Sequence, residues 1–233
     1  MHAVYYVRPG ENEELRYSLR SVAAHTPVER VTLIGGYPQW LNTDTVEVIP
    51  GNPHEIKQLN GFENIRIAAR ENRGDFVVFN DDFIVLQDIV DPLPYFHRHA
   101  IENHILQAST KTEEGRHRKR MLVDMSVYLK YNKVANPYSF ETHIPMRING
   151  QKLLDRMDHY FEWWSTEPAP IMWRTLYGNQ EPIDEQQGRR DVITHGTDSF
   201  AMSKDFASTS DRSVAPILEL LSERFPEPSR WEK

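Results

Sequence analysis

The hydrophobic pattern of the first half alternates between short apolar runs and a helical period. Apolar runs predict strands at residues 3–7, 31–34, 46–49 and 76–79, with a further apolar run at 83–86. Apolar residues at helical spacing predict one helix that begins after Asn12 and ends at Thr26, and another over residues 60–72. Strands that alternate with helices are typical of an α/β fold with a mainly parallel sheet.

The second half is more helical and less regular. Residues 109–120 are polar and charged without apolar periodicity, which predicts an exposed loop. Helices are predicted over 121–131, over 149–164 with Asn149 as its cap, and over 213–224. We therefore expect a single domain over residues 1–233, with an α/β core in 1–108 and a helical C-terminal lobe in 121–233.

Composition excludes several classes of protein. The 233 residues carry a net charge of −7, which argues against a broadly basic surface that coats nucleic acid. The absence of cysteine excludes disulfides, cysteine nucleophiles and cysteine-ligated metals. No apolar run is long enough to cross a membrane, and the first residues lack the pattern of a signal peptide, so we expect a cytoplasmic protein with no membrane partner.

Two adjacent carboxylates are the sharpest chemical feature. Asp81 and Asp82 follow the apolar run 76–79 and precede the run 83–86. In open α/β sheets, ligands bind outside the carboxyl ends of strands, and Mg²⁺ or Mn²⁺ is held by one or two carboxylates together with substrate phosphates. The pattern favours a metal–diphosphate site, with a solvated turn as the structural alternative.

Three further residues are candidates with a structural alternative each. His143 is a possible base, phosphate partner or metal ligand, or a structural histidine. Arg174, beside Trp173, suits a phosphate clamp or a surface arginine packed on aromatic rings. Asp211 is a candidate base or a helix cap.

The common nucleotide and hydrolase motifs are missing. The chain has no G-x-G-x-x-G fingerprint, no phosphate-binding P-loop, no G-x-S-x-G elbow and no H-E-x-x-H helix. Dehydrogenase and hydrolase functions therefore lack their usual sequence support.

Four segments, in order along the chain, resemble the Stealth family of sugar-1-phosphate transferases. They are ELRYSLRSVAAHTPVERVTLIGGYPQWLN, LNGFENIRIAARENRGDFVVFNDDFIV, YSFETHIPMRI and DFASTSDRSVAPILELLSERFPEPSRWE. The resemblance implies a GT-A-like, Rossmann-type core in residues 1–108 that binds a nucleoside-diphosphate sugar, with a UDP-sugar favoured, and an acceptor-side lobe in 121–233. It also implies Mn²⁺ or Mg²⁺ as cofactor.

The resemblance also assigns roles to residues. It implies that Asp81 and Asp82 hold the metal and that Asn80 joins Asp81 in binding the donor. It implies that His143, Arg174 and Asp211 complete the catalytic site. Arg16 and Arg20 lie in the first matching segment. We expect this pair either to bind the donor or to stabilise the fold.

Several alternatives stay open. The opening AVYYVRPGENEE lacks the tryptophan and acidic residues of the family's opening, so glycosyl transfer and sugar-1-phosphate transfer are both expected possibilities. The acceptor is a saccharide hydroxyl on the family resemblance, or a hydroxymethylated base in DNA if the basic run 116–120 contacts phosphates, or a protein side chain. A non-catalytic nucleotide-sugar-binding module and a metal-dependent phosphoesterase are the alternatives from other classes.

Overall fold

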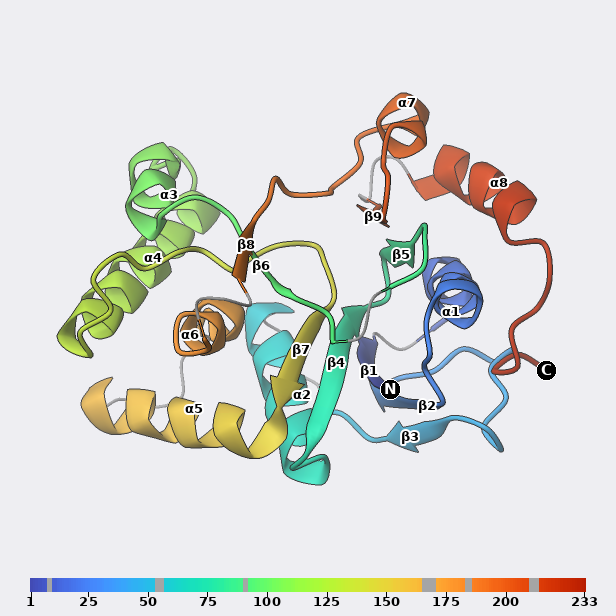
Figure 1. Ribbon diagram of the computed structural model, residues 1–233, viewed down its shortest axis with the longest axis horizontal. Coiled ribbons are helices and arrows are strands. Elements are labelled where there is room, and N and C mark those ends of the chain that lie inside the picture. The colour runs from blue at the N-terminus through green and yellow to red at the C-terminus, as the bar shows by residue number, and fades with distance from the viewer. Residues whose placement is uncertain (8–9, 53–56, 90–91, 165–170, 183–185, 210–213) are drawn as a thin grey trace. The chain divides into compact units, whose positions relative to one another are not determined.

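The computed structural model describes residues 1–233 except 8–9, 53–56, 90–91, 165–170, 183–185 and 210–213 (Figure 1). Its strands are β1 (His2–Val7), β2 (Arg30–Gly35), β3 (Glu47–Ile49), β4 (Asp75–Asn80), β5 (Phe83–Val85), β6 (Tyr95–His97), β7 (Met146–Asn149), β8 (Gln186–Gly188) and β9 (Phe206–Ser208). Its helices are α1 (Glu13–His25), α2 (Lys57–Glu71), α3 (Ile101–Gln107), α4 (Glu113–Tyr131), α5 (Gly150–Trp164), α6 (Trp173–Gly178), α7 (Thr197–Ala201) and α8 (Val214–Arg224).

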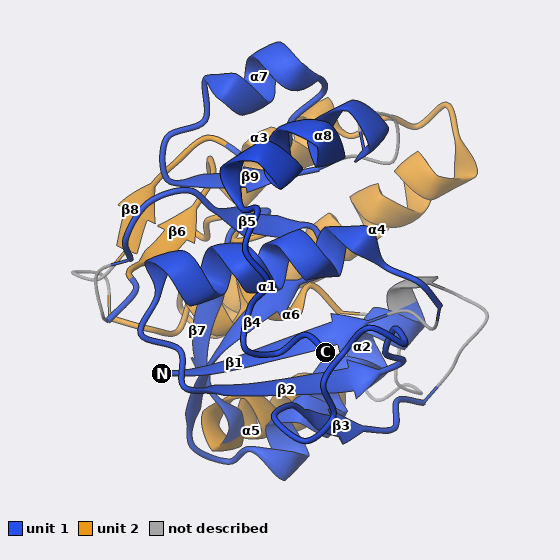
Figure 2. Ribbon diagram, turned by 90° about the vertical axis from the view of Figure 1, so that its right-hand side faces the viewer, with its two compact units in different colours: residues 1–93, 143–150, 191–233 blue, residues 94–142, 151–190 orange. Residues whose placement is uncertain are grey.

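The chain forms two compact units (Figure 2). Unit 1 contains residues 1–93, 143–150 and 191–233, and unit 2 contains residues 94–142 and 151–190. This division differs from the expected one between 1–108 and 121–233, because residues 143–150 and 191–233 return to the unit that the first 93 residues begin.

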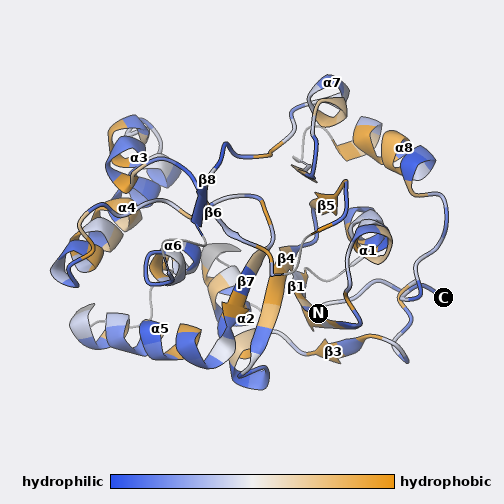
Figure 3. Ribbon diagram, viewed as in Figure 1, coloured by the Kyte–Doolittle hydropathy of each residue, from blue (hydrophilic) through white to orange (hydrophobic). Residues whose placement is uncertain are grey.

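The central sheet of unit 1 has five strands in the order β3-β2-β1-β4-β7. Its first four strands are parallel, and β7 runs antiparallel to β4. Four consecutive residues of β4 are buried, and β4 is hydrophobic along most of its length (Figure 3), as expected for a strand covered on both faces. The structure confirms the α/β fold with a mainly parallel sheet.

The side of β1 on which the chain adds strands to the sheet changes after β3. From β1 the chain adds β2 and β3 on one side, and then crosses to add β4 on the other side. Such a switch point leaves a crevice beyond the carboxyl ends of the two strands, where ligands of open α/β sheets bind. The residues that directly follow β4 therefore lie where a ligand of such a sheet is expected to bind.

Gly35 ends β2 as the sequence predicted. Its φ is +113°, and a Cβ there would lie 2.3 Å from the carbonyl oxygen of Val7. Only glycine allows this close approach of β2 to the end of β1. The next residue, Gly36, donates its backbone N–H to the same carbonyl at 3.1 Å.

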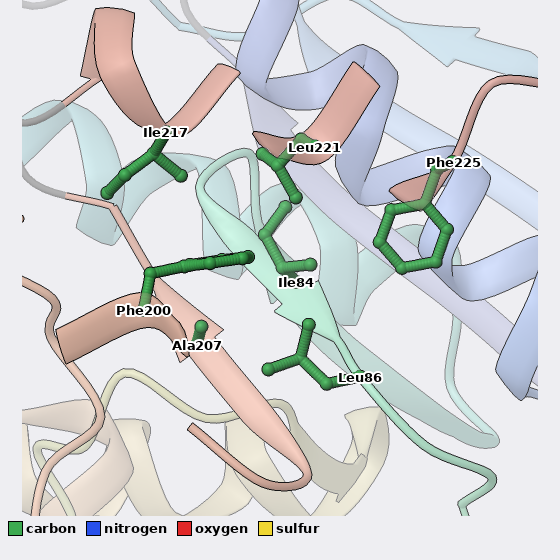
Figure 4. Close-up of a cluster of buried hydrophobic side chains, with 7 residues drawn as sticks. All are labelled: Ile84, Leu86, Phe200, Ala207, Ile217, Leu221 and Phe225. Atoms are coloured by element: carbon green, nitrogen blue, oxygen red, sulfur yellow. The ribbon is translucent and has the colours of Figure 1, made fainter. Parts of the chain in front are cut away.

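A second hydrophobic cluster lies beside the main sheet in unit 1. Ile84 of β5 lies at its centre, with Phe200 of α7, Leu221 of α8 and Phe225 around it (Figure 4). Strands β5 and β9 pair antiparallel through the register Phe83↔Ser208. The cluster thereby packs β5, which directly follows the Asp81–Asp82 turn, together with β9.

Unit 2 combines helices with a small two-stranded sheet. Helix α3 packs against α4, and β6 pairs parallel with β8. One face of α5 is apolar and buried, at Leu153, Leu154, Met157 and Tyr160. Inside this unit, the Arg156 guanidinium donates to the Glu181 carboxylate at 2.8 Å.

The prediction of an exposed loop over 109–120 holds for residues 109–112 and was wrong for 113–120, because α4 begins at Glu113. Thr112 caps the helix by accepting the backbone N–H of Gly115 at 3.1 Å. Glu113 and Glu114 occupy the first turn, where negative charge is favourable. The first turns are exposed, so they carry no apolar period, and capping rather than hydrophobicity marks the start of this helix.

In the part of the chain that the structure describes, no helix combines the length and the apolar character that crossing a bilayer requires.

Candidate functional site

The Asp81–Asp82 turn lies at the switch point of the sheet. Strand β4 ends at Asn80, beside Tyr6 of β1, and the two aspartates follow at once. Both are partly exposed although buried strands flank them. The adjacent apolar runs thus place two carboxylates at the carboxyl end of a central strand, as the sequence predicted.

Asn12 joins the start of α1 to Asp81. Its side-chain oxygen accepts the backbone N–H of Leu15 at 3.0 Å, and so caps the helix. Its amide nitrogen donates to Oδ2 of Asp81 at 2.7 Å. The sequence predicted the cap, but the second contact needs the folded sheet, since 69 positions separate the two residues.

Asp82 is held by the strand β9. The hydroxyl of Ser208 donates to Oδ2 of Asp82, and the backbone N–H of Thr209 donates to its carbonyl oxygen at 3.3 Å. The hydroxyl of Thr209 also donates to Glu14 in the first turn of α1. Sequence reasoning missed these partners because 126 positions separate Ser208 from Asp82.

Burial raises the pKa of Asp82 above its ordinary value, and the neighbouring charge of Asp81 adds to the effect. The hydrogen bond from Ser208 and the positive charge of a protonated His143 oppose it. In the part of the chain that the structure describes, no lysine or arginine forms an ion pair with Asp82. The turn therefore concentrates negative charge that the described side chains leave unneutralised.

His143 lies in unit 1 and is tied to Asp191. Its Nδ1 lies 3.0 Å from each carboxylate oxygen of Asp191, and its backbone N–H donates to the same side chain at 3.0 Å. The ring also meets Phe83 edge-on, with 6.3 Å between ring centroids. Asp191 is a site residue that the sequence did not single out, because it stands in a polar stretch with no period or motif.

Arg16 and Arg20 both form ion pairs with Glu232. Arg20 donates to the two carboxylate oxygens at 2.9 and 2.8 Å and to the carbonyls of Phe225 and Pro226. Nε of Arg16 lies 3.7 Å from the same carboxylate, and its guanidinium stacks over Trp40. This is the bracing arrangement that was one of the two expectations for this pair, and their donor-binding role stays a prediction.

Neither of the two remaining candidates, Arg174 and Asp211, belongs to the described part of unit 1. Arg174 belongs to α6 of unit 2, where it is 4% exposed and its guanidinium lies over the Trp173 ring. Asp211 lies outside the described residues. The described candidates that unit 1 itself assembles are the Asn80–Asp82 turn and His143.

The residues of the turn fit a hard divalent cation. The side-chain oxygen of Asn80 is buried and has no hydrogen-bond partner among the described residues. Together with the carboxylates of Asp81 and Asp82, it offers the oxygen donors that Mg²⁺ and Mn²⁺ prefer. The described residues contain no cluster of three or more His, Asp or Glu side chains around one point, so the remaining ligands would come from water and donor phosphates, as is usual for Mg²⁺.

Comparison with known proteins gives limited similarity. No protein-family model matches the chain. An alignment of 91 residues at 35% identity relates it to the N-acetylglucosamine-1-phosphotransferase subunits alpha/beta of Mus musculus. The alignment covers 34% of this chain and 7% of the mouse protein, so it spans only a small part of that relative.

Two crystal structures of the galactosyltransferase LgtC align over most of this chain, each at 12% identity. The complex with donor and acceptor sugar analogs aligns with a TM-score of 0.45 over 94% of this chain and 82% of LgtC. An active-site mutant gives a TM-score of 0.44 over 100% and 85%.

Proposed function

We propose that the protein is a metal-dependent transferase that moves sugar-1-phosphate from a nucleoside-diphosphate sugar, with a UDP-sugar favoured, to the hydroxyl of a saccharide. One observation carries the proposal: Asp81 and Asp82 stand at the switch point with no ion-pairing lysine or arginine among the described residues. A bound cation and a diphosphate together complete such a site electrostatically, because the cation offsets both the carboxylates and the phosphates.

The choice of transferred group rests on the sequence. The mouse relative is named for transfer of N-acetylglucosamine-1-phosphate, and the four ordered segments of this chain resemble transferases of the same class. Glycosyl transfer is the competing reaction, and it differs in the nucleotide that leaves. Sugar-1-phosphate transfer releases a nucleoside monophosphate, and glycosyl transfer releases a nucleoside diphosphate.

The chain's own residues have distinct tasks in this proposal. Asn80, Asp81 and Asp82 hold the cation and thereby the donor diphosphate. When bound, Mn²⁺ or Mg²⁺ supplies positive charge that stabilises the developing charge on the phosphates. His143 accepts the proton of the acceptor hydroxyl, and Arg174 and Asp211 keep the catalytic roles that the resemblance implies.

The test is a turnover assay with Mn²⁺ and a panel of UDP- and GDP-sugars, offered with saccharides, with hydroxymethylated DNA and with water alone. We expect release of a nucleoside monophosphate that requires both the metal and a saccharide. Release of a diphosphate would establish glycosyl transfer instead. Release without any acceptor would indicate a phosphoesterase, and transfer to DNA would establish the alternative acceptor.

Metal binding is measured separately from turnover. The electron paramagnetic resonance signal of free Mn²⁺ falls when the ion binds, and we expect this fall with the unaltered protein and not with Asp82→Asn. Asp75 provides a matched control, because it lies at the opposite end of the same strand and is exposed. If Asp75→Asn and Asp82→Asn bind Mn²⁺ equally well, the metal site is wrong. Binding of metal and donor with no release would establish a non-catalytic module.

A further inference from the structure

The contact between His143 and Asp191 goes beyond a single hydrogen bond. Both carboxylate oxygens lie 3.0 Å from Nδ1 of the ring. One of them also accepts the backbone N–H of His143 at 3.0 Å and that of Val192 at 2.9 Å. Four contacts therefore fix the carboxylate and, through it, both the backbone and the ring of His143.

This arrangement specifies where the ring carries its proton. A carboxylate beside Nδ1 favours the tautomer with hydrogen on Nδ1, which leaves the lone pair on Nε2. Among the described residues, Nε2 of His143 has no hydrogen-bond partner. The ring of His143 also contacts Phe83, the residue directly after Asp82. A positive charge on this ring would lower the pKa of Asp82.

A purely structural role is the alternative. His143 and Asp191 each begin a segment through which the chain returns to unit 1, and a carboxylate that accepts two backbone N–H groups would fasten these segments together. Fastening requires only the backbone contacts. It does not require that the ring be held in one tautomer, and this difference separates the two roles.

We propose that Asp191 is a positioning residue that holds His143 with its proton on Nδ1, so that Nε2 accepts the proton of the acceptor hydroxyl. The inference rests on the proposed function. As the hydroxyl oxygen forms its bond to the β-phosphorus of the donor, the bond from that phosphorus to the bridging oxygen breaks. The bridging oxygen and the electron pair leave with the nucleoside monophosphate, and the hydroxyl proton moves to Nε2.

The substitution Asp191→Asn separates the two roles. Its side-chain oxygen can still accept the backbone N–H groups of His143 and Val192, whereas its NH₂ group would face Nδ1 and favour the opposite tautomer. His25 and Asp88 provide a matched control, because they form a histidine–aspartate contact of 3.1 Å in which Asp88 is 92% exposed. Asp88→Asn removes the same charge from a pair outside the site.

The first measurement is a long-range ¹H–¹⁵N spectrum of the histidine rings near pH 8.5, in which the His143 signals are those lost in His143→Gln. We expect a protonated Nδ1 and a bare Nε2 in the unaltered protein, and a shift toward the other tautomer in Asp191→Asn alone. This readout needs no substrate, and the unaltered protein tests it even where a variant fails to fold. A proton on Nε2 in the unaltered protein, or an unchanged spectrum in Asp191→Asn, overturns the proposal.

The second measurement is the steady-state rate of transfer. We expect Asp191→Asn to lower kcat by about 100-fold or more, as loss of a histidine-orienting carboxylate does in hydrolases, with the donor KM within about threefold. The double variant with His143→Gln should be no slower than His143→Gln alone, since both changes disable one unit. The proposal is overturned if Asp191→Asn loses no more kcat than Asp88→Asn does. It is also overturned if His143→Gln retains full turnover.

The two measurements also separate this inference from the proposed function. If the unaltered protein transfers nothing, the proposed function fails and so does the proton-acceptor role of His143. The ring spectrum then still supports or overturns the positioning of His143 by Asp191.

Discussion

Two partly buried carboxylates of unit 1, Asp82 and Glu232, have opposite surroundings. Burial tends to raise the pKa of Glu232, but the hydrogen bonds from Arg20 and from the backbone N–H of Ser229 lower it below its ordinary value. Burial raises the pKa of Asp82 as well, but Asp82 lies beside another carboxylate, and its pKa stays above its ordinary value. Among the described residues, Glu232 has a cationic partner in Arg20, and Asp82 has no lysine or arginine partner. This difference is expected if Glu232 stabilises the fold and Asp82 binds a ligand, as proposed above.

The largest expected difference between the two acids is in turnover. Asp82→Asn should lower metal-dependent turnover by about 1000-fold, because the cation loses a charged ligand beside the donor. Turnover by Glu232→Gln, measured below the unfolding temperature of the variant, should stay within about threefold of turnover by the unaltered protein. The check is nucleotide release at saturating Mn²⁺, and equal losses in the two variants would remove the distinction.

The second expected difference is in stability, where Glu232→Gln should have the larger effect and Asp82→Asn the smaller. Glu232→Gln should lower the free energy of unfolding by about 2 kcal/mol, because Arg20 would keep a partly buried charge without its partner. Asp82→Asn in EDTA should leave that free energy unchanged or raise it, since it removes a carboxylate whose charged form is disfavoured. Urea unfolding of both variants measures this, and a destabilised Asp82→Asn would contradict the comparison.

The pH dependence of the free energy of unfolding should also distinguish Glu232→Gln from Asp82→Asn. Glu232 has a lowered pKa in the folded state, so its stabilisation is complete above pH 4.5 and is lost as the pH falls through that lowered pKa. Asp82 has a raised pKa, so its stabilisation is complete below pH 3.8 and is lost as the pH rises through the raised pKa. The unaltered protein should therefore lose its advantage over Glu232→Gln in acid, whereas Asp82→Asn should gain its advantage toward neutral pH. Unfolding curves in EDTA across the acid range test both trends.

The smallest expected effect comes from a third acid with a similar arginine contact. Arg30 donates to Glu47 at 2.7 Å, but both side chains are largely exposed, at 58% and 45%. Glu47→Gln should cost less than about 0.5 kcal/mol and should cost less still at high salt. A cost as large as that of Glu232→Gln would mean that the contact distance, rather than burial, sets the value of these pairs.

The positions of the site residues in the sheet could be predicted from the sequence, because local patterns encode them. Apolar runs on both sides of Asp81 and Asp82 placed them at a strand end, and Asn12 was recognisable as the cap of α1. The helical start of α4 was missed because exposed charged turns have no apolar period, and Thr112 followed by two glutamates was the available signal.

The partners of the site residues could not be predicted, because the fold joins positions that are distant in sequence. Ser208 reaches Asp82 across 126 positions, and Asp191 reaches His143 across 48. Ser208 lies in the last of the four segments that resemble the Stealth family, but the resemblance assigns it no role, and Asp191 lies in none of the four. A single sequence contains no local pattern that links such pairs, so only the three-dimensional structure reveals them.

The discontinuous course of unit 1 bears on how the protein is made. Synthesis proceeds from the N-terminus, so the ribosome completes β1, α1 and β4 well before it adds residues 191–233. Until then β5 lacks its partner β9, Ile84 lacks the cover of α8, and Asp82 lacks Ser208. The nascent chain thus exposes an unpaired apolar strand for much of its synthesis, a state in which chains aggregate or engage chaperones.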